Sequence, residues 1–429
     1  RVIGHLTCVS CGIKRLSKMG INSLRGRAIA VLAACIFTAF AAFSIRYSYG
    51  ILLPEMLSPL GMTKAQAGTI FASYFAINCL SSPVAGIISD RCNLRILITA
   101  FVMLMGVGTF LMQYATSVMQ ASACFALAGM GAAACWAPVM VIAQRWTGDS
   151  IRGTVLSLVD AGSSLGVMAA GTLVPLFVAR SGWQSGWAFL GLTAVAVGAV
   201  NFICIRNRPP QASDGLATEK KYAVLSNEPA ISYRSLFSNR LFWIIALAYL
   251  FNGFAIIIPF TFLNTYACRE LAMSYEAAGF LITLTGVGGL VGKLTLGPLS
   301  DRFGRAVIML VCAALVTMGA LGMAYSTGVA LQMVTFLFGV GYGACWGMYA
   351  ACASDYFSKR SVGAILGTWS LYLGIGSFLA PIVSGWAADS SGTLQSAFIV
   401  AACGGIVSLL LLLPLLKIQK QGIHRTVTP

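Results

Sequence analysis

Twelve long apolar runs constrain the fold of this 429-residue chain more than any other feature of its sequence. A helix that crosses a bilayer needs about 20 mostly apolar residues. Runs of that length lie near residues 28–53, 65–89, 96–115, 119–144, 154–178, 185–205, 240–266, 275–299, 306–325, 328–353, 362–387 and 393–416. Membrane-spanning β-strands would instead alternate in polarity over segments of about ten residues. We therefore predict an all-α, polytopic membrane protein with twelve transmembrane helices.

Charged residues are scarce and lie between these runs. Asp, Glu, Lys and Arg make up 9% of the chain, against about 25% in soluble domains. The net charge is +16, but the basic residues punctuate the apolar runs, as they do in the loops of membrane proteins. The composition excludes a soluble globular protein, and we expect no nucleic-acid partner.

The distribution of Lys and Arg predicts how the spans are oriented. With both termini inside, only Lys64, Arg180 and Arg269 face outside, Arg46 and Lys293 lie within spans, and the rest of the 28 basic residues are cytoplasmic. Cytoplasmic loops are enriched in Lys and Arg. We therefore expect a multi-pass protein of the cell (inner) membrane with both termini in the cytoplasm.

The longest polar stretch, residues 206–239, divides the spans into two groups of six. The expected segments are a cytoplasmic N-terminal tail (1–27), a six-helix bundle (28–205), a cytoplasmic central loop (206–239), a second six-helix bundle (240–416) and a cytoplasmic C-terminal tail (417–429). Residues 1–18 precede Met19, a candidate start, and are either an upstream stretch or a basic tail.

Residues that bind metals or catalyse reactions are missing from the apolar runs. Both histidines, His5 and His424, lie in the tails, and the CxxC of Cys8 and Cys11 has no second pair to complete a zinc site. The other cysteines lie mostly within spans, where they act as small hydrophobic residues. The chain has no GxxxxGK[ST] phosphate-binding loop. We expect no metal, no cofactor and no enzyme activity.

Two motifs occur once in each half of the chain. GIISDR at 86–91 follows the second span, and GPLSDR at 297–302 follows the eighth. GMGAAACW at 129–136 in the fourth span matches GVGYGACW at 339–346 in the tenth. The two offsets are 211 and 210 residues. Internal repeats of this kind are typical of secondary transporters, whose binding site lies at the midplane between the repeats.

The GxxSDR pattern resembles the cytoplasmic loop motif of the major facilitator superfamily. Further segments are similar to its bacterial monocarboxylate-transporter-like branch, which includes oxalate/formate-type porters: residues 43–50, Arg145-Trp146, Arg152-Gly153, 161–163 and 292–297. The resemblance covers the chain after residue 27. It implies the major facilitator fold, with two pseudo-symmetric six-helix halves and transport by alternating access.

The repeated loop residues are expected to form a conformational latch. They are Gly86, Asp90, Arg91, Gly297, Asp301 and Arg302. An Asp beside an Arg at a helix end can cap or pair with a neighbouring helix end and so stabilise one conformation. The alternative is a topology charge beside a turn, and two copies in equivalent places favour the latch.

Arg46, Asp160 and Lys293 are the charged residues within the predicted spans. A charge at bilayer depth costs at least about 2.5–3.5 kcal/mol and usually faces a cavity or a partner. Lys293 precedes Asp301 by eight residues, so it lies roughly 12 Å from the helix end. Relatives usually carry Arg at this position, bound to the substrate carboxylate. The resemblance therefore implies that Lys293 binds the substrate anion.

Asp160 lies at nearly the depth of Lys293, on a face shared with Ser157 and Ser164. In the superfamily, the fifth and eighth spans meet across the two halves. Asp160 could thus pair with Lys293 until an anion or a proton breaks the pair; the rival is a static pair with Arg46. Relatives carry their proton-coupling acid one turn before the basic residue, where this chain has Gly289, so we expect Asp160 to replace it.

Arg46 resembles the basic residue that relatives carry in the first span to attract the anion; the alternative is an Arg that snorkels to the outer interface. Uncharged side chains are also expected to line the cavity and contact the substrate: Tyr49, Asn78, Asn252, Tyr342, Tyr349 and Tyr372, with Tyr47 and Trp346 as further candidates.

Two basic side chains and one acidic side chain leave this cavity with a net charge of +1. We therefore predict a monomeric secondary transporter of a small organic anion, a monocarboxylate, with protons as the coupling ion and the lipid bilayer as its surroundings. Alternatives are an anion exchanger of the same fold, or a drug or metabolite efflux transporter. The non-transport alternative is a membrane sensor with a degenerate transporter site.

Overall fold

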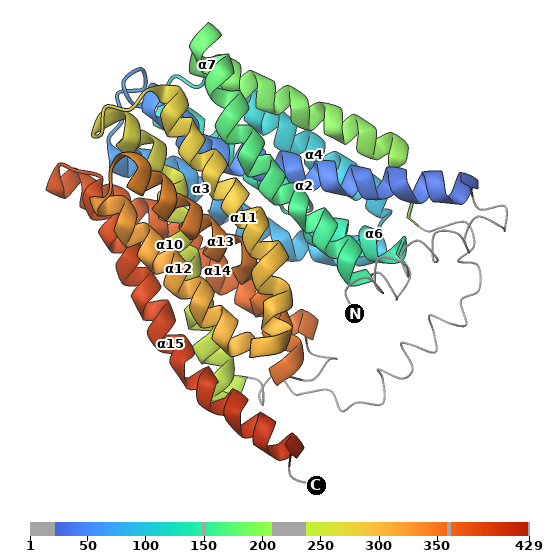
Figure 1. Ribbon diagram of the computed structural model, residues 1–429. Coiled ribbons are helices and arrows are strands. Elements are labelled where there is room, and N and C mark those ends of the chain that lie inside the picture. Colours follow the sequence, from blue (N-terminus) through green and yellow to red (C-terminus); the bar gives the residue numbers. More distant parts are fainter. Residues whose placement is uncertain (1–21, 148–151, 208–236, 358–361, 428–429) are drawn as a thin grey trace.

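The computed structural model describes residues 22–147, 152–207, 237–357 and 362–427, and these residues are almost entirely helical (Figure 1). The helices of the first half are α2 (Asn22–Leu57), α3 (Lys64–Arg91), α4 (Leu94–Leu111), the short η2 (Met112–Tyr114), α5 (Val118–Ala132), α6 (Ala137–Arg145) and α7 (Arg152–Cys204). Those of the second half are α10 (Arg240–Arg269), α11 (Tyr275–Phe303), α12 (Arg305–Tyr325), α13 (Gly328–Tyr356), α14 (Val362–Ser391) and α15 (Gln395–Val427). The described residues contain no strand, so the predicted all-α class is confirmed.

Within the described residues, 11 helical segments are long and apolar enough to cross a membrane, and one of them crosses twice. The segment Val155–Cys204 has 50 residues, about 75 Å as a straight helix, which is more than twice the thickness of a hydrocarbon core. Its backbone breaks at Ser181 and at Gly182, whose φ of 78° favours glycine. Phe177 and Phe189 stack across the break at 4.1 Å, so α7 is a hairpin. The described residues therefore account for twelve crossings, in agreement with the predicted number.

The fourth crossing, predicted as a continuous span over 119–144, is interrupted between α5 and α6 at residues 133–136. Pro138 lies in the first turn of α6. Because proline has no N–H and its ring clashes with the carbonyl four residues earlier, the helix ends before it and begins again with it. The matching motif at 339–346 lies inside the unbroken helix α13, where Gly347 and Met348 follow it.

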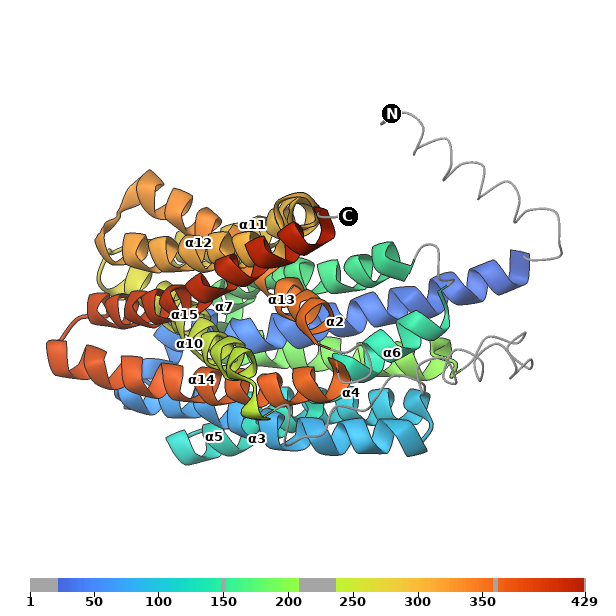
Figure 2. The same ribbon diagram turned by 90° about the horizontal axis from the view of Figure 1, so that it is seen from below.

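The helices form two bundles, α2–α7 and α10–α15, which lie together at one end and diverge toward the other (Figures 1 and 2). We call the end at which α2 and α10 begin the terminal end. The opposite end, which holds the α2–α3 turn and the α14–α15 turn, is the distal end. Helices α2, α3 and α7 of the first bundle face α10, α11 and α14 of the second.

At the distal end the bundles are packed backbone against backbone. A Cβ added to Gly50 of α2 would overlap the carbonyl oxygen of Phe260 of α10. One added to Gly68 of α3 would overlap that of Pro381 of α14. Glycine is needed at both positions because no side chain fits between the helices.

Polar contacts between the bundles close the same end. Asp389 of α14 accepts hydrogen bonds from the backbone N–H groups of Lys64 at 3.1 Å and Ala65 at 2.8 Å, which begin α3. Lys64 Nζ also lies 3.5 Å from a carboxylate oxygen of Glu270. Three side chains of the second bundle donate to backbone carbonyls of α2: Asn264 and Tyr275 to Ile51, and Arg269 to Pro54.

Glycines toward the terminal end lie in open space. A Cβ added to Gly86, Gly297, Gly347 or Gly367 would meet no atom within 4 Å. These glycines belong to α3, α11, α13 and α14. The bundles are therefore closed on each other at the distal end and separated toward the terminal end.

Candidate anion site between the bundles

An ion pair joins the two bundles within the membrane-spanning helices. Nζ of Lys293, on α11, lies 3.0 Å from Oδ1 of Asp160, on α7. The ammonium also donates to the backbone carbonyl of Asp160 at 2.9 Å and to Oγ of Ser163 at 2.6 Å. The Lys293 side chain is 11% exposed and the Asp160 side chain 25%. Of the two pairs that the sequence left open for Asp160, the structure thus contains the one between the halves.

The three N–H bonds of the Lys293 ammonium match the three oxygen atoms that surround it. These are the carboxylate and carbonyl oxygens of Asp160 and the hydroxyl of Ser163. An incoming anion can therefore reach Lys293 only by displacing one of these partners. The Asp160 carboxylate carries the same charge as a substrate carboxylate and is the chemically equivalent competitor.

Small residues bring α7 and α11 close enough for this pair to form. A Cβ at Gly286 would lie 2.6 Å from the Met168 side chain, and one at Gly289 would lie 3.3 Å from Oγ of Ser164. Gly286 and Gly289 thus serve close packing of the two helices. Beyond Lys293, at Gly297, the space is open. The ion pair lies at the boundary between the packed and the separated parts of the interface.

Arg46 is surrounded by aromatic rings. Its guanidinium carbon lies 4.9 Å from the ring centre of Phe43, 5.5 Å from that of Tyr74 and 5.6 Å from that of Phe75. Its Nε donates to the Tyr74 hydroxyl at 3.4 Å. Arg46 makes no ion pair with any described carboxylate. The rival pair of Arg46 with Asp160 is absent, and aromatic faces attract the guanidinium.

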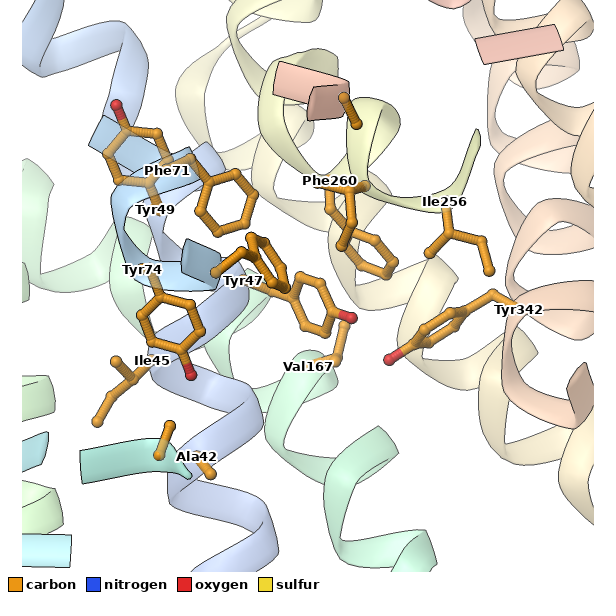
Figure 3. Close-up of a cluster of buried hydrophobic side chains, with 14 of the residues drawn as sticks. Ala42, Ile45, Tyr47, Tyr49, Phe71, Tyr74, Val167, Ile256, Phe260 and Tyr342 are labelled. Atoms are coloured by element: carbon orange, nitrogen blue, oxygen red, sulfur yellow. The ribbon is translucent and has the colours of Figure 1, made fainter. Parts of the chain in front are cut away.

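Aromatic side chains connect the surroundings of Arg46 to the second bundle (Figure 3). Tyr47 of α2 stacks on Phe260 of α10 with ring centres 3.9 Å apart. Tyr342 of α13 meets Tyr47 edge-on at 6.0 Å, and in Figure 3 the two hydroxyl groups point toward each other. Trp346 lies one turn further along α13, 6.1 Å from the Tyr342 ring. These rings form a bridge between the halves.

Two of the expected substrate contacts occupy packing positions. Tyr49 is fully buried, its hydroxyl donates to the carbonyl of Ala67 at 2.7 Å, and its ring stacks on Phe71. Tyr349 stacks on Tyr249 at 4.0 Å.

Asn78 and Tyr372 are partly buried and contact residues of their own bundles. Asn78 donates to the backbone carbonyl of Gly129 at 3.1 Å. Tyr372 packs edge-on against Trp243 near the start of α10. Among the expected uncharged contacts, Tyr342 and Asn252 lie beside residues that neighbour Lys293 in the sequence or in space. Gly289, one turn before Lys293, packs on the Tyr342 ring, and Asn252 lies against Cys345.

The second copy of the loop motif makes its contacts within one bundle. Asp301 pairs with Arg305 at 2.8 Å, and Arg305 pairs with Asp355 of α13 at 3.3 Å. Arg302 is exposed. The side chains of Asp90 and Arg91 lie outside the described residues. A latch between the two halves therefore stays a prediction.

The sequence analysis missed Ser163 as a partner of Lys293. It assigned the polar face of α7 to Ser157, Asp160 and Ser164. Residues three and four apart lie on the same side of a helix, so spacing alone does not distinguish Ser163 from Ser164. In the structure, Ser163 contacts Lys293, and Ser164 is buried against Gly289. No group of three His, Cys, Asp or Glu residues in the described ranges could hold a metal ion.

Comparisons with known proteins cover most of the chain. The sequence profile of the Major Facilitator Superfamily matches residues 32–278 and 268–426. The chain is similar to the membrane sensor protein UhpC of Salmonella typhimurium, with 26% identity over 90% of each protein. It is also similar to Monocarboxylate transporter 12 of Xenopus laevis, with 21% identity over 89% of this chain and 87% of that protein. Its fold is similar to that of a crystallised mutant of the nucleoside transporter NupG, with a TM-score of 0.74, 14% identity and coverage of 90% and 99%.

Proposed function

This chain belongs to the Major Facilitator Superfamily of membrane transporters, and we propose that it carries a small organic anion, a monocarboxylate, together with a proton. The observation that carries this proposal is the Lys293 ammonium, held by a carboxylate of the opposite bundle. A substrate carboxylate that binds Lys293 replaces Asp160 there. The contact between the bundles then depends on whether the site is occupied.

Proton coupling follows from what happens to the displaced Asp160. Once the substrate holds Lys293, the Asp160 carboxylate has lost its cationic partner in a partly buried position. Loss of an opposite charge and burial both favour the protonated form of a carboxyl group. Asp160 then takes up a proton, and substrate and proton travel together.

Arg46 supplies the second positive charge of this cavity. Its positive charge has no carboxylate partner among the described residues, whereas that of Lys293 is balanced by Asp160. The excess of one positive charge attracts anions and disfavours cationic drugs. In the orientation that the basic loops predict, the terminal end is cytoplasmic. The separated bundles then describe an inward-facing state of a transporter in the inner membrane.

The sensor relative favours a second candidate function, a membrane sensor that binds an anion without moving it. A sensor keeps the binding site and lacks the flux. The two functions are therefore separated by measuring binding and transport on the same protein.

The test is proton flux into proteoliposomes that contain a pH-sensitive dye, with the voltage clamped by valinomycin and potassium. Lactate, pyruvate, glycolate, oxalate, formate, succinate and aromatic acids are added outside. We expect internal acidification with a subset of these acids, above that of protein-free liposomes. Flux should be lost in Lys293→Ala. It should largely remain in Lys293→Arg, because this variant keeps the positive charge and has the residue that relatives usually carry at this position.

Other outcomes decide between the alternatives. Flux that appears only when the liposomes are preloaded with an acid indicates an exchanger. Binding of an acid without flux in either arrangement indicates a sensor. Neither binding nor flux with any acid contradicts the proposed substrate class.

A further inference from the structure

Two buried hydrogen-bond donors, on α10 and α13, have no oxygen or nitrogen partner among the described residues. Asn252 of α10 is 2% exposed, and its Nδ2 atom makes no hydrogen bond with any described residue. The same holds for the buried Nε1 atom of Trp346 on α13. Buried polar groups in native proteins are nearly always satisfied, so each exception has a structural or functional reason.

The two donors belong to one contact between α10 and α13. Tyr249, one turn before Asn252, meets the Trp346 ring edge-on at 5.8 Å. The Asn252 side chain also interacts with the thiol of Cys345, a weak hydrogen-bonding group. Cys345 directly precedes Trp346 and lies within electrostatic range of Lys293. Both donors therefore lie beside Cys345, which interacts electrostatically with Lys293.

Lys293 and Trp346 also lie at the same depth. Helices α11 and α13 run in the same direction, because both begin at the distal end. A Cβ at Gly289 of α11 would lie 3.5 Å from the ring of Tyr342 of α13, so these two residues are level. Lys293 and Trp346 each follow four residues later, about 6 Å further along. The Trp346 residue is partly exposed, while its Nε1 atom is buried.

We propose that Asn252 and Trp346 form a donor subsite beside Lys293, which recognises an acceptor oxygen on the transported anion in addition to its carboxylate. This inference rests on the proposed function and narrows its substrate class. Both free groups are N–H donors, so they suit an oxygen that only accepts. The expected substrates are carboxylates with an oxo group, and plain alkyl carboxylates leave both donors unpaired.

The expected discrimination is large enough to measure. A site built to hydrogen-bond a substrate group rejects the analogue that lacks it, by as much as about 10⁴-fold in favourable cases. With two buried, neutral donors, we expect kcat/KM to differ by at least about tenfold between an oxo acid and its plain analogue. The comparison uses acids with one carbon skeleton: pentanoate, 2-oxopentanoate and 4-oxopentanoate, whose oxo groups lie at two distances from the carboxylate.

The experiment measures transport of these three acids by the full chain in proteoliposomes. At least one oxo acid should exceed pentanoate by about tenfold or more. Asn252→Leu and Trp346→Phe, which keep bulk and remove the donor, should each lower that preference severalfold, because the oxo acid loses more transport than pentanoate does. Trp386→Phe on α14, whose parent side chain is 68% exposed, is the matched control and should keep the preference.

Three results would overturn the subsite. In the first, the wild-type protein transports pentanoate and both oxo acids equally well. In the second, a preference exists but survives in both donor variants. In the third, both variants lose all three acids in proportion, which indicates a structural role. Failure of every acid to bind or move contradicts the proposed function itself, and the subsite with it.

Discussion

The distal and terminal ends of the interface between the bundles differ in what holds them. At the distal end, Gly50 and Gly68 allow the backbones of α2 and α3 to touch those of α10 and α14, and Asp389 binds the first N–H groups of α3. At the terminal end, Gly86 and Gly297 face open space. The described ion pairs of that end, such as Arg305 with Asp355, stay within one bundle.

This difference indicates that contacts at the distal end stabilise the observed conformation. The contacts that oppose separation are concentrated at the distal end, and Lys293 with Asp160 is the polar contact between the bundles that lies nearest the terminal end among the described residues. Opening the distal end must break backbone packing, a helix cap and an ion pair. Their relative strengths are testable one at a time.

The largest effect is expected from Gly50→Ala. The added methyl overlaps the Phe260 carbonyl only when the distal end is closed. Overpacking of this kind costs about 1–3 kcal/mol, and about 1.4 kcal/mol corresponds to a tenfold change in an equilibrium. We expect the population with a separated distal end to rise by about tenfold or more, with a matching loss of transport.

Electron paramagnetic resonance between spin-labelled amino acids at Ser58 and Ser390, on the distal turns of the two bundles, measures this population. Gly297→Ala is the matched control, because its methyl enters open space. Equal distance distributions for Gly50→Ala and Gly297→Ala would contradict the difference between the two ends.

An intermediate effect is expected from Asp389→Asn. The carboxylate accepts two backbone hydrogen bonds at the start of α3, where the helix dipole favours a negative charge. Loss of such a cap costs about 0.5–2 kcal/mol, so the same distance measurement should show a severalfold shift toward separation. Asp355→Asn removes an acidic side chain whose partner Arg305 lies in the same bundle, and it should leave the distal distance unchanged.

The smallest effect is expected from Lys64→Ala. The side chains of Lys64 and Glu270, which form an ion pair, are each 24% exposed. Ion pairs near the surface contribute about 0–1 kcal/mol to stability. The backbone N–H group of residue 64 that binds Asp389 remains in this variant. A shift larger than that of Asp389→Asn would show that the ion pair, and not the helix cap, closes the distal end.

The sequence predicts the crossings because twenty apolar residues in a row have one stable arrangement in a bilayer. The similarity of the two motif copies does not predict the interruption at 133–136, because the proline that interrupts the helix lies after the first copy and not within it. Pro138 follows the first copy and Met348 the second. The effect of a proline on helix continuity was the available signal.

The sequence also indicates the charged residues of the candidate site. Charges within apolar runs are costly and few, so Lys293, Asp160 and Arg46 stand out. The contacts of the distal end do not stand out in the sequence. Asp389 and Lys64 are separated by 325 residues, and both lie at the ends of spans, where polar residues are common. The aromatic rings around Arg46 were equally hidden, since Phe and Tyr are common throughout the spans.

The central claim is that a substrate carboxylate competes with Asp160 for Lys293. The most direct test is the affinity of a transported acid for Asp160→Asn and for Lys293→Ala. Asp160→Asn removes the competitor and leaves the ammonium, so binding should tighten by about tenfold while uptake loses its dependence on the pH gradient. Lys293→Ala should abolish binding. Equal loss of binding in both variants, or unchanged pH dependence in Asp160→Asn, would contradict the account.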